Sequence, residues 1–173
     1  VREIPIDMVE KQLDKFIHAN VPLVKFVDRT FNCNRKRAIQ IIQYISKAQC
    51  DTCFHFEIGA DLLDDATLAL FGTARKGLFQ IEAGIQSTYP PTLAAINRKE
   101  NVYPVLYNLE RLIALGNVHV HVDLIAGLPY ESYELLRRSF DKVYELHADA
   151  LQLGFLKVLA GPPLAAEVER PSI

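Results

Sequence analysis

The stretch LFQIEAGIQ at residues 78–86 decides the fold, because its apolar and polar residues alternate strictly. Successive side chains of a β-strand point to opposite faces of a sheet. One face of this strand is therefore apolar, and we expect helices to cover it. The apolar face carries Phe79, Ile81, Ala83 and Ile85, and the opposite face carries Gln80, Glu82, Gly84 and Gln86.

Four more stretches have the pattern of strands, at residues 23–28, 54–59, 118–126 and 151–158. Helical periodicity fills the segments between them, which is typical of βα units and a parallel sheet. Helices are expected at 34–47, 64–73 and 134–147, and another begins near Pro104. A first helix, capped by Asp7 and Glu10, carries an apolar stripe from Val9 through Leu13 and Phe16 to Ile17.

Right-handed crossovers would place all these helices on one side of a curving sheet. The fold class is therefore α/β, a partial (β/α) barrel. Polar residues of the other face, such as His55, Glu57, His121 and Asp123, then converge on the concave side. Charged groups in a dry interior are costly unless paired, so we expect this side to enclose water and a polar ligand. The alternative is an antiparallel sheet with one solvated face.

Composition limits the class of protein. The chain has 173 residues, of which 50% are hydrophobic and 23% charged, as in an ordinary globular protein. We expect residues 1–173 to form a single domain. A net charge of −2 gives no basic surface for nucleic acid, and no apolar run reaches the ~18 residues of a membrane helix. Three cysteines favour a reducing compartment, so we expect a cytoplasmic protein.

Five motifs in order resemble the radical S-adenosylmethionine (radical SAM) superfamily, and they extend along nearly the whole chain. VKFVDRTFN (24–32) resembles the second barrel strand of cobalamin-dependent members, and FHFEIGAD (54–61) the third. IEAGIQS (81–87) with NRKE (97–100) resembles the fourth strand and its loop in relatives of anaerobic coproporphyrinogen oxidase. DLIAGLPYES (123–132) and FLKVLAGPPL (155–164) resemble the fifth and sixth strands, although Pro162 stands where relatives often have threonine.

The resemblance implies that the chain holds strands two to six of the barrel and contacts SAM through four main residues. Glu57 would accept from the ammonium or the ribose, and Arg98 would hold the carboxylate as a bidentate donor. Gln86 and Asp123 would bind further polar groups of SAM. Each of the four residues also has a structural alternative. Glu57 could pair with a residue of a neighbouring strand, and Arg98 could be a charge on a helix surface. Gln86 could be an amide whose hydrogen bonds are satisfied inside the barrel, and Asp123 could be a partner of His121 or His119. The resemblance also implies contacts by Ser87, Gly127 and Leu156, and more weakly by Asp28 and Glu82.

The cysteines do not match the family's cluster motif. Radical SAM enzymes bind a [4Fe–4S] cluster through C-x-x-x-C-x-x-C, whereas this chain has only Cys33, Cys50 and Cys53. We interpret these as free thiols, and a zinc site formed with His55 is the alternative. The first strand and the cluster loop are therefore expected upstream, in a longer parent protein. The resemblance to cobalamin-dependent members also implies a cobalamin-binding domain in that parent.

The resulting hypothesis is a fragment of a radical SAM oxidoreductase whose parent cleaves SAM reductively and whose substrate the sequence does not identify. The fragment alone would be inactive, and its open sheet edges would favour self-association. One alternative is a non-catalytic nucleotide-binding barrel module without a cluster. Another is a conventional barrel hydrolase or aldolase, but no phosphate-binding glycine run supports it.

Overall fold

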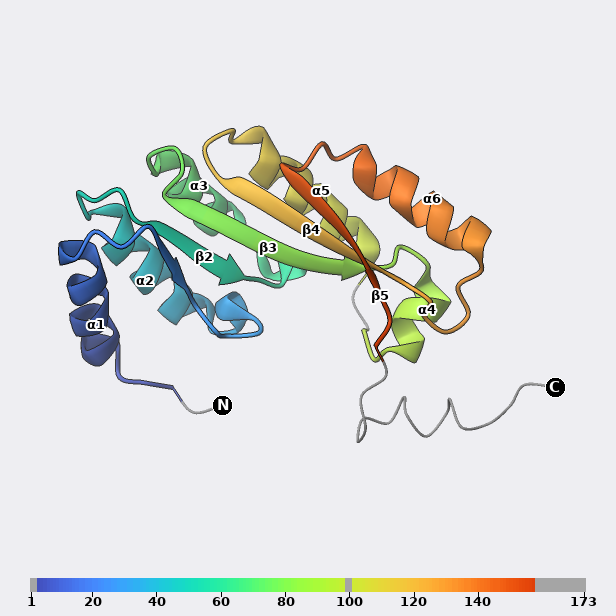
Figure 1. Cartoon of the computed structure of the whole chain (residues 1–173), viewed down its shortest axis with the longest axis horizontal. Coiled ribbons are helices and arrows are strands. Elements are labelled where there is room, and N and C mark those ends of the chain that lie inside the picture. The colour runs from blue at the N-terminus through green and yellow to red at the C-terminus, as the bar shows by residue number, and fades with distance from the viewer. Residues whose placement is uncertain (1–2, 99–100, 158–173) are drawn as a thin grey trace.

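The computed structural model describes residues 3–98 and 101–157, and the strands among them form one parallel sheet (Figure 1). Each strand lies beside the next one in the chain, and the sheet is not closed. The order therefore confirms the predicted partial barrel. The strands are β1 (Leu23–Lys25), β2 (Cys53–Glu57), β3 (Phe79–Gln86), β4 (His119–Ala126) and β5 (Ala150–Phe155).

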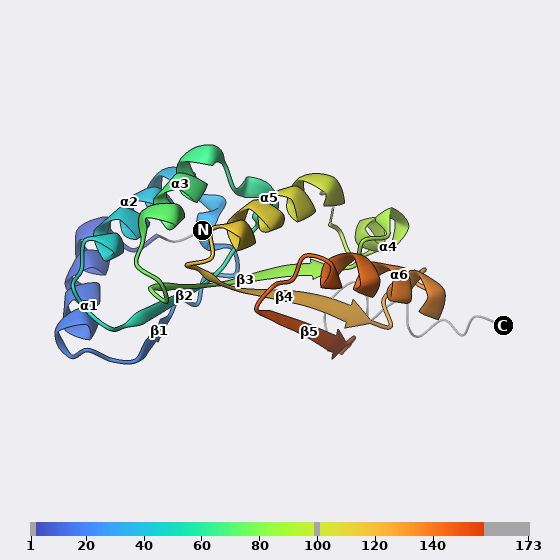
Figure 2. The same ribbon diagram turned by 90° about the horizontal axis from the view of Figure 1, so that it is seen from above.

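The helices alternate with the strands, and Figure 2 shows α2, α3 and α5 together on one side of the sheet. This arrangement leaves the other face of the central strands uncovered, as the alternating pattern predicted. The helices are α1 (Ile6–His18), α2 (Arg35–Ser46), α3 (Asp65–Thr73), α4 (Pro90–Ala95), α5 (Val102–Ala114) and α6 (Tyr133–Tyr144). Two short 3₁₀ turns, Phe31–Cys33 and Ala60–Leu62, follow β1 and β2.

Helix starts follow side-chain caps in most places. The Asn34 side chain accepts from the backbone N–H of Arg37 at 3.2 Å, and the Asp64 side chain accepts from that of Thr67 at 2.8 Å. The predicted capping box at Asp7 is wrong, because α1 begins at Ile6 with Pro5 as its N-cap, two residues earlier, and has no side-chain cap. The preset φ of Pro5 starts the helix, and Asp7 lies in the first turn, where its charge favours the helix dipole.

The core lies between the helices and the apolar strand faces. Phe56 is fully buried, and its ring lies 4.0 Å from the centroid of Phe31 and 4.7 Å from that of Phe26. The alternate residues of β3 and β4 are buried in the same way, which confirms the predicted apolar faces of the central strands.

β5 differs from this pattern, because its predicted apolar face is largely exposed. Leu153 is 42% exposed and Phe155 is 78% exposed. The reason is the position of β5 at the sheet edge, while α6 packs chiefly against β4. β5 also ends at Phe155, before the predicted end at 158, and residues 158–164 of the motif at 155–164 lie outside the described residues. Lys99 and Glu100 of the NRKE motif lie outside them too.

β1 is shorter than the predicted strand at 23–28, because it ends at Lys25. The side chain of Asn32 connects the loop after β1 to the loop after β2. Asn32 donates to the carbonyl of Gly59 at 2.8 Å and accepts from the Gly59 N–H at 2.9 Å. Asn32 is only 6% exposed. These two loops therefore keep a constant separation at the carboxyl edge of the sheet.

β1 and β5 each have one neighbouring strand, so the sheet has two open edges. Self-association through these edges stays a prediction, as does the single domain over residues 1–173. Among the described residues, none of the helices has the length and apolar character needed to cross a bilayer.

Candidate functional site on the polar face of the sheet

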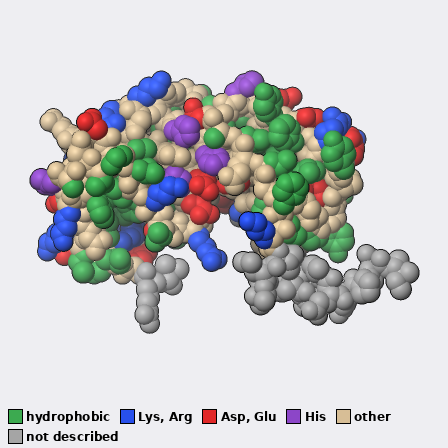
Figure 3. Space-filling model, viewed as in Figure 1, with side chains coloured by type: hydrophobic (Ala, Val, Ile, Leu, Met, Phe, Trp, Pro, Cys, Tyr) green, Lys and Arg blue, Asp and Glu red, His purple; other side chains and the backbone are tan. Residues whose placement is uncertain are grey.

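Histidine and carboxylate side chains form a connected network on the uncovered face of the sheet, visible near the middle of Figure 3. His55 Nε2 lies 3.0 Å from Glu82 Oε2. Glu82 lies close enough to Asp123 to raise the pKa of that carboxyl. His121 Nε2 lies 3.3 Å from Asp123 Oδ1. The network therefore joins β2, β3 and β4.

Strand register brings these residues together. Glu57 pairs with Glu82 across β2 and β3, and Glu82 pairs with His121 across β3 and β4. Asp123 pairs with Gly84, two residues further along the same face. Because parallel neighbours in register share a face, the predicted polar contacts of three strands meet in one place.

Gly84 is the point around which Gln86 and Arg98 gather. Arg98 Nη1 donates to the Gly84 carbonyl at 2.6 Å. A Cβ at Gly84 would lie 2.2 Å from Gln86 Nε2, so the amide occupies the space that the missing side chain leaves. The register shifts here, and Gln86 has a φ of 68°. This β-bulge turns the Gln86 side chain back over the sheet.

Two oxygen atoms in this cluster have no hydrogen-bond partner among the described residues. They are Gln86 Oε1 and Asp123 Oδ1, and both are buried. The ring of His121 is close to Asp123 but makes only an ion-pair contact with it. A buried acceptor without a donor costs about 1–3 kcal/mol, so a ligand that brings hydroxyl or ammonium donors would stabilise this site.

The electrostatics of the site centre on Asp123. Burial raises the pKa of Asp123 to about 6, and the neighbouring carboxylates Glu82 and Glu57 contribute, while His121 opposes the shift. Burial also lowers the pKa of His55, with Lys25 acting in the same direction. His55 is therefore neutral near pH 7. Since its Nδ1 has no partner within the described chain, its Nε2–H is the donor to Glu82.

The structure gathers Glu57, Glu82, Gln86, Arg98 and Asp123 on this face, as the sequence motifs predicted. Glu82 also has a structural partner on this face, because it accepts a hydrogen bond from His55. Binding of SAM by these five residues stays a prediction.

The remaining predicted contacts lie elsewhere. Ser87 is fully buried and donates to Glu131, in the loop before α6. Gly127 has a φ of 87°, and a Cβ there would lie 3.8 Å from Leu156 Cβ, so these two residues adjoin each other after β4 and β5. The cofactor contacts proposed for Ser87, Gly127 and Leu156 stay predictions.

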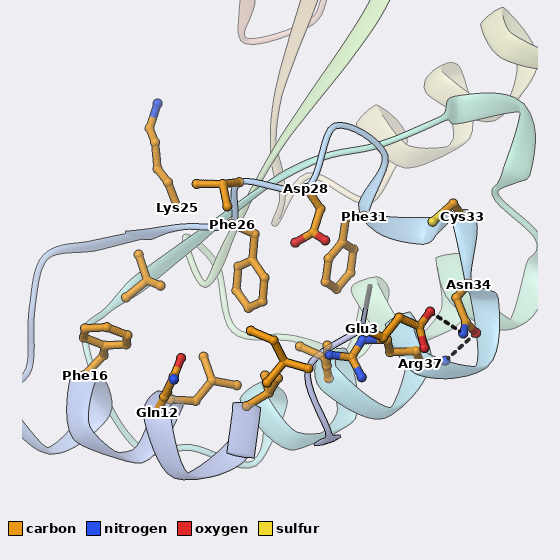
Figure 4. Close-up of a pocket in the computed structure, with 16 residues that line it drawn as sticks. Glu3, Gln12, Phe16, Lys25, Phe26, Asp28, Phe31, Cys33, Asn34 and Arg37 are labelled. Atoms are coloured by element: carbon orange, nitrogen blue, oxygen red, sulfur yellow. Dashed lines mark hydrogen bonds between the residues drawn. The ribbon is translucent and has the colours of Figure 1, made fainter. Parts of the chain in front are cut away.

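Asp28 lies instead in a cavity of about 400 Å³ between β1, α1 and α2 (Figure 4). Its carboxylate points into this cavity beside the rings of Phe26 and Phe31, while Lys25 points away. Phe16 also lines the cavity and is 43% exposed, so the stripe predicted for α1 is only partly buried. Among the described residues that line this cavity, Asp28 is the one that was predicted to contact SAM.

The three cysteines are free, and they lie at opposite edges of the sheet. Cys53 begins β2, and Cys50 precedes it, whereas Cys33 follows β1 at the carboxyl edge. Within residues 3–98 and 101–157, no group of three or more His, Cys, Asp or Glu side chains is arranged to hold a metal ion. The described residues therefore give no support to the zinc alternative built from Cys33, Cys50, Cys53 and His55.

Comparison with known proteins identifies the family. The model of the radical SAM superfamily matches residues 1–152 of the chain. The chain belongs to the radical SAM superfamily. The heme chaperone HemW of Mycobacterium tuberculosis, in strains H37Rv and CDC 1551, is 35% identical over 101 residues, which are 58% of this chain and 26% of HemW.

Solved structures of radical SAM proteins share the fold. The methyltransferase TsrM from Kitasatospora setae, with cobalamin and a [4Fe–4S] cluster bound, superposes with a TM-score of 0.80 at 16% identity over 96% of this chain and 31% of TsrM. Coproporphyrinogen III oxidase (HemN) from Escherichia coli gives a TM-score of 0.67 at 16% identity over 92% of this chain and 40% of HemN. This radical SAM chain thus spans about a quarter of HemW and less than half of either structure.

Sequence reasoning missed the polar contacts that join the loops around the site. Glu131 accepts from Ser87 and also from Ser139 Oγ at 3.4 Å, and Thr88 N–H donates to Ser139 Oγ at 3.1 Å. Thr88 and Ser139 are 51 residues apart in the chain. Ser139 is the sequence signal that could have predicted these contacts, because it lies on the apolar side of α6 and a buried hydroxyl needs a hydrogen-bond partner.

Proposed function

We propose that this chain forms the SAM-binding part of the barrel in a radical SAM enzyme. The observation that carries the proposal is a pair of buried acceptors near the guanidinium of Arg98, Gln86 Oε1 and Asp123 Oδ1, to which the described part of the chain donates no hydrogen bond. SAM offers ammonium and ribose donors for these acceptors and a carboxylate for Arg98. Membership in the superfamily supports the same ligand.

Each residue then has a role that its chemistry allows. Asp123 accepts from the ribose hydroxyls, and Gln86 accepts from a second donor of SAM. Arg98 already holds the Gly84 carbonyl through Nη1, which orients its guanidinium over β3. Glu57 is exposed at the end of β2, where its charge attracts the cationic groups of SAM.

The [4Fe–4S] cluster does not fit the cysteines of this chain. Cys33 and the pair Cys50 and Cys53 lie at opposite edges of the sheet, so they cannot ligate one cluster together. We propose that the cluster ligands lie outside this chain. In the superfamily, SAM bound at such a cluster supplies radical chemistry, and the protein positions it.

The proposal predicts weak but specific SAM binding by the chain alone. Titration calorimetry should give a dissociation constant on the order of 0.1–1 mM, because the contacts to a cluster are missing. Arg98→Ala and Asp123→Ala should each weaken binding by about 1–3 kcal/mol, roughly 5- to 150-fold. Glu57→Gln keeps the volume of the side chain but removes its negative charge. A weaker affinity of this variant would therefore show that the charge of Glu57 contributes to SAM binding.

His119→Ala is the matched control, because His119 begins β4 and lies near Asp149 rather than the cluster around Gly84. Its SAM affinity should equal that of the unaltered chain. The proposal is wrong if Arg98→Ala and Asp123→Ala bind SAM like the unaltered chain, or if only His119→Ala loses binding.

A further inference from the structure

Glu82 lies between a hydrogen-bond donor, His55, and the neighbouring carboxyl of Asp123. Glu82 accepts from the neutral His55 ring through Nε2–H, at 3.0 Å. With this donor on one side, Glu82 remains an acceptor on the other side, toward Asp123. When the Asp123 carboxyl is protonated, its O–H can therefore donate to Glu82.

The surroundings of Asp123 support this assignment. From β2 it faces Glu57, from β3 Glu82, and from its own strand His121, while His55 reaches it only through Glu82. Its register partner in β5 is the uncharged Gln152. Arg98 reaches the Gly84 carbonyl beside it. Two nearby carboxylates cannot both ionise easily in a buried place, and here the more buried Asp123 is the one disfavoured as an anion.

We propose that Glu82 and His55 are positioning residues for Asp123, and that together they make the affinity for SAM fall as the solution becomes acidic. This inference rests on the proposed SAM site. An ionised Asp123 is the stronger acceptor for a ribose hydroxyl, whereas a protonated Asp123 directs its O–H to Glu82.

The sign of the pH dependence follows from the pKa of Asp123, which is about 6. Above this pH the carboxylate is ionised and binds the diol, and below it the binding-competent fraction falls. Between pH 7 and pH 5 the ionised fraction falls about tenfold, so the dissociation constant for SAM should rise about tenfold. The ammonium and carboxylate of SAM keep their charges across this range.

Glu82→Gln tests the positioning role directly. The amide removes a negative neighbour and can donate to Asp123, so the midpoint of the affinity profile should move to lower pH by about one unit. His55→Phe removes the donor that holds Glu82 as an acceptor, and should also lower the midpoint. His55→Gln restores an N–H near the position of Nε2 and should rescue the profile. His119→Gln, at the far end of β4, is the matched control and should leave it unchanged.

Two measurements separate the failure of this inference from the failure of the SAM site. Calorimetry with SAM between pH 5 and pH 7 gives the affinity profile, and carbon-13 NMR of the Asp123 carboxyl in the SAM-free chain gives its titration. If SAM binds but the Glu82→Gln profile superposes on that of the unaltered chain, the positioning role is wrong. If SAM does not bind at any pH, the SAM site is wrong. In that case, a lower midpoint of the Asp123 carboxyl titration in Glu82→Gln would still support the effect of Glu82 on Asp123.

Discussion

Replacing Phe56 with alanine should lower the free energy of unfolding by about 3–5 kcal/mol, the largest loss that we expect from a single substitution. Phe56 is fully buried, and its ring packs against three others, including Phe31 at 4.0 Å and Phe79 at 5.8 Å between centroids. The variant leaves a cavity between β2 and the loop after β1. Chemical denaturation followed by circular dichroism measures the loss.

Phe155→Ala is the matched control for size and chemistry. Phe155 lies at the end of the edge strand β5 and is 78% exposed, so its replacement should change the stability by less than about 0.5 kcal/mol. Equal losses for the two variants would contradict the placement of the core on one face of the sheet.

Asn32→Ala should destabilise the chain by about 2–3 kcal/mol, the second largest expected effect. The substitution leaves both the N–H and the carbonyl of Gly59 without their partners, at 2.9 and 2.8 Å. It also frees the loop after β1 from the loop after β2. The same denaturation experiment measures the change.

Asn34→Ala removes an asparagine from the same loop and serves as the control. Its side chain caps α2 by accepting from the Arg37 N–H, so we expect a loss of about 1 kcal/mol. Asn32 would have no special structural role if the two variants lost the same stability.

The central strands could be predicted from the sequence because their pattern is local. Alternation in β3 and β4 assigns each residue to a face, and a parallel order follows from helices of sufficient length between the strands. The last strand failed this reasoning, because the burial of Leu153 and Phe155 depends on what covers β5 and not on the alternation itself.

The site was predictable only in part, for a similar reason. Motif resemblance identified Gln86, Arg98 and Asp123, and their gathering at Gly84 agrees with it. The contacts of Glu82 with His55 and Asp123 depend on strand register, which residue types alone do not determine. The positive φ of Gln86 depends on a β-bulge between Gly84 and Gln86, which the alternation of residue types does not predict. The sequence signal that could have indicated it is Gly84, because a glycine inside a strand often marks a bulge.

The central claim is that SAM binds on the polar face of the sheet, and two-dimensional NMR of the nitrogen-15-labelled chain during a SAM titration tests it most directly. The account predicts that the largest shifts occur at the amides of Gln86, Arg98 and Asp123, while those of Phe31 and Arg37, which line the cavity between α1, α2 and β1, stay in place. Shifts confined to that cavity, or no shifts at millimolar SAM, would contradict the account.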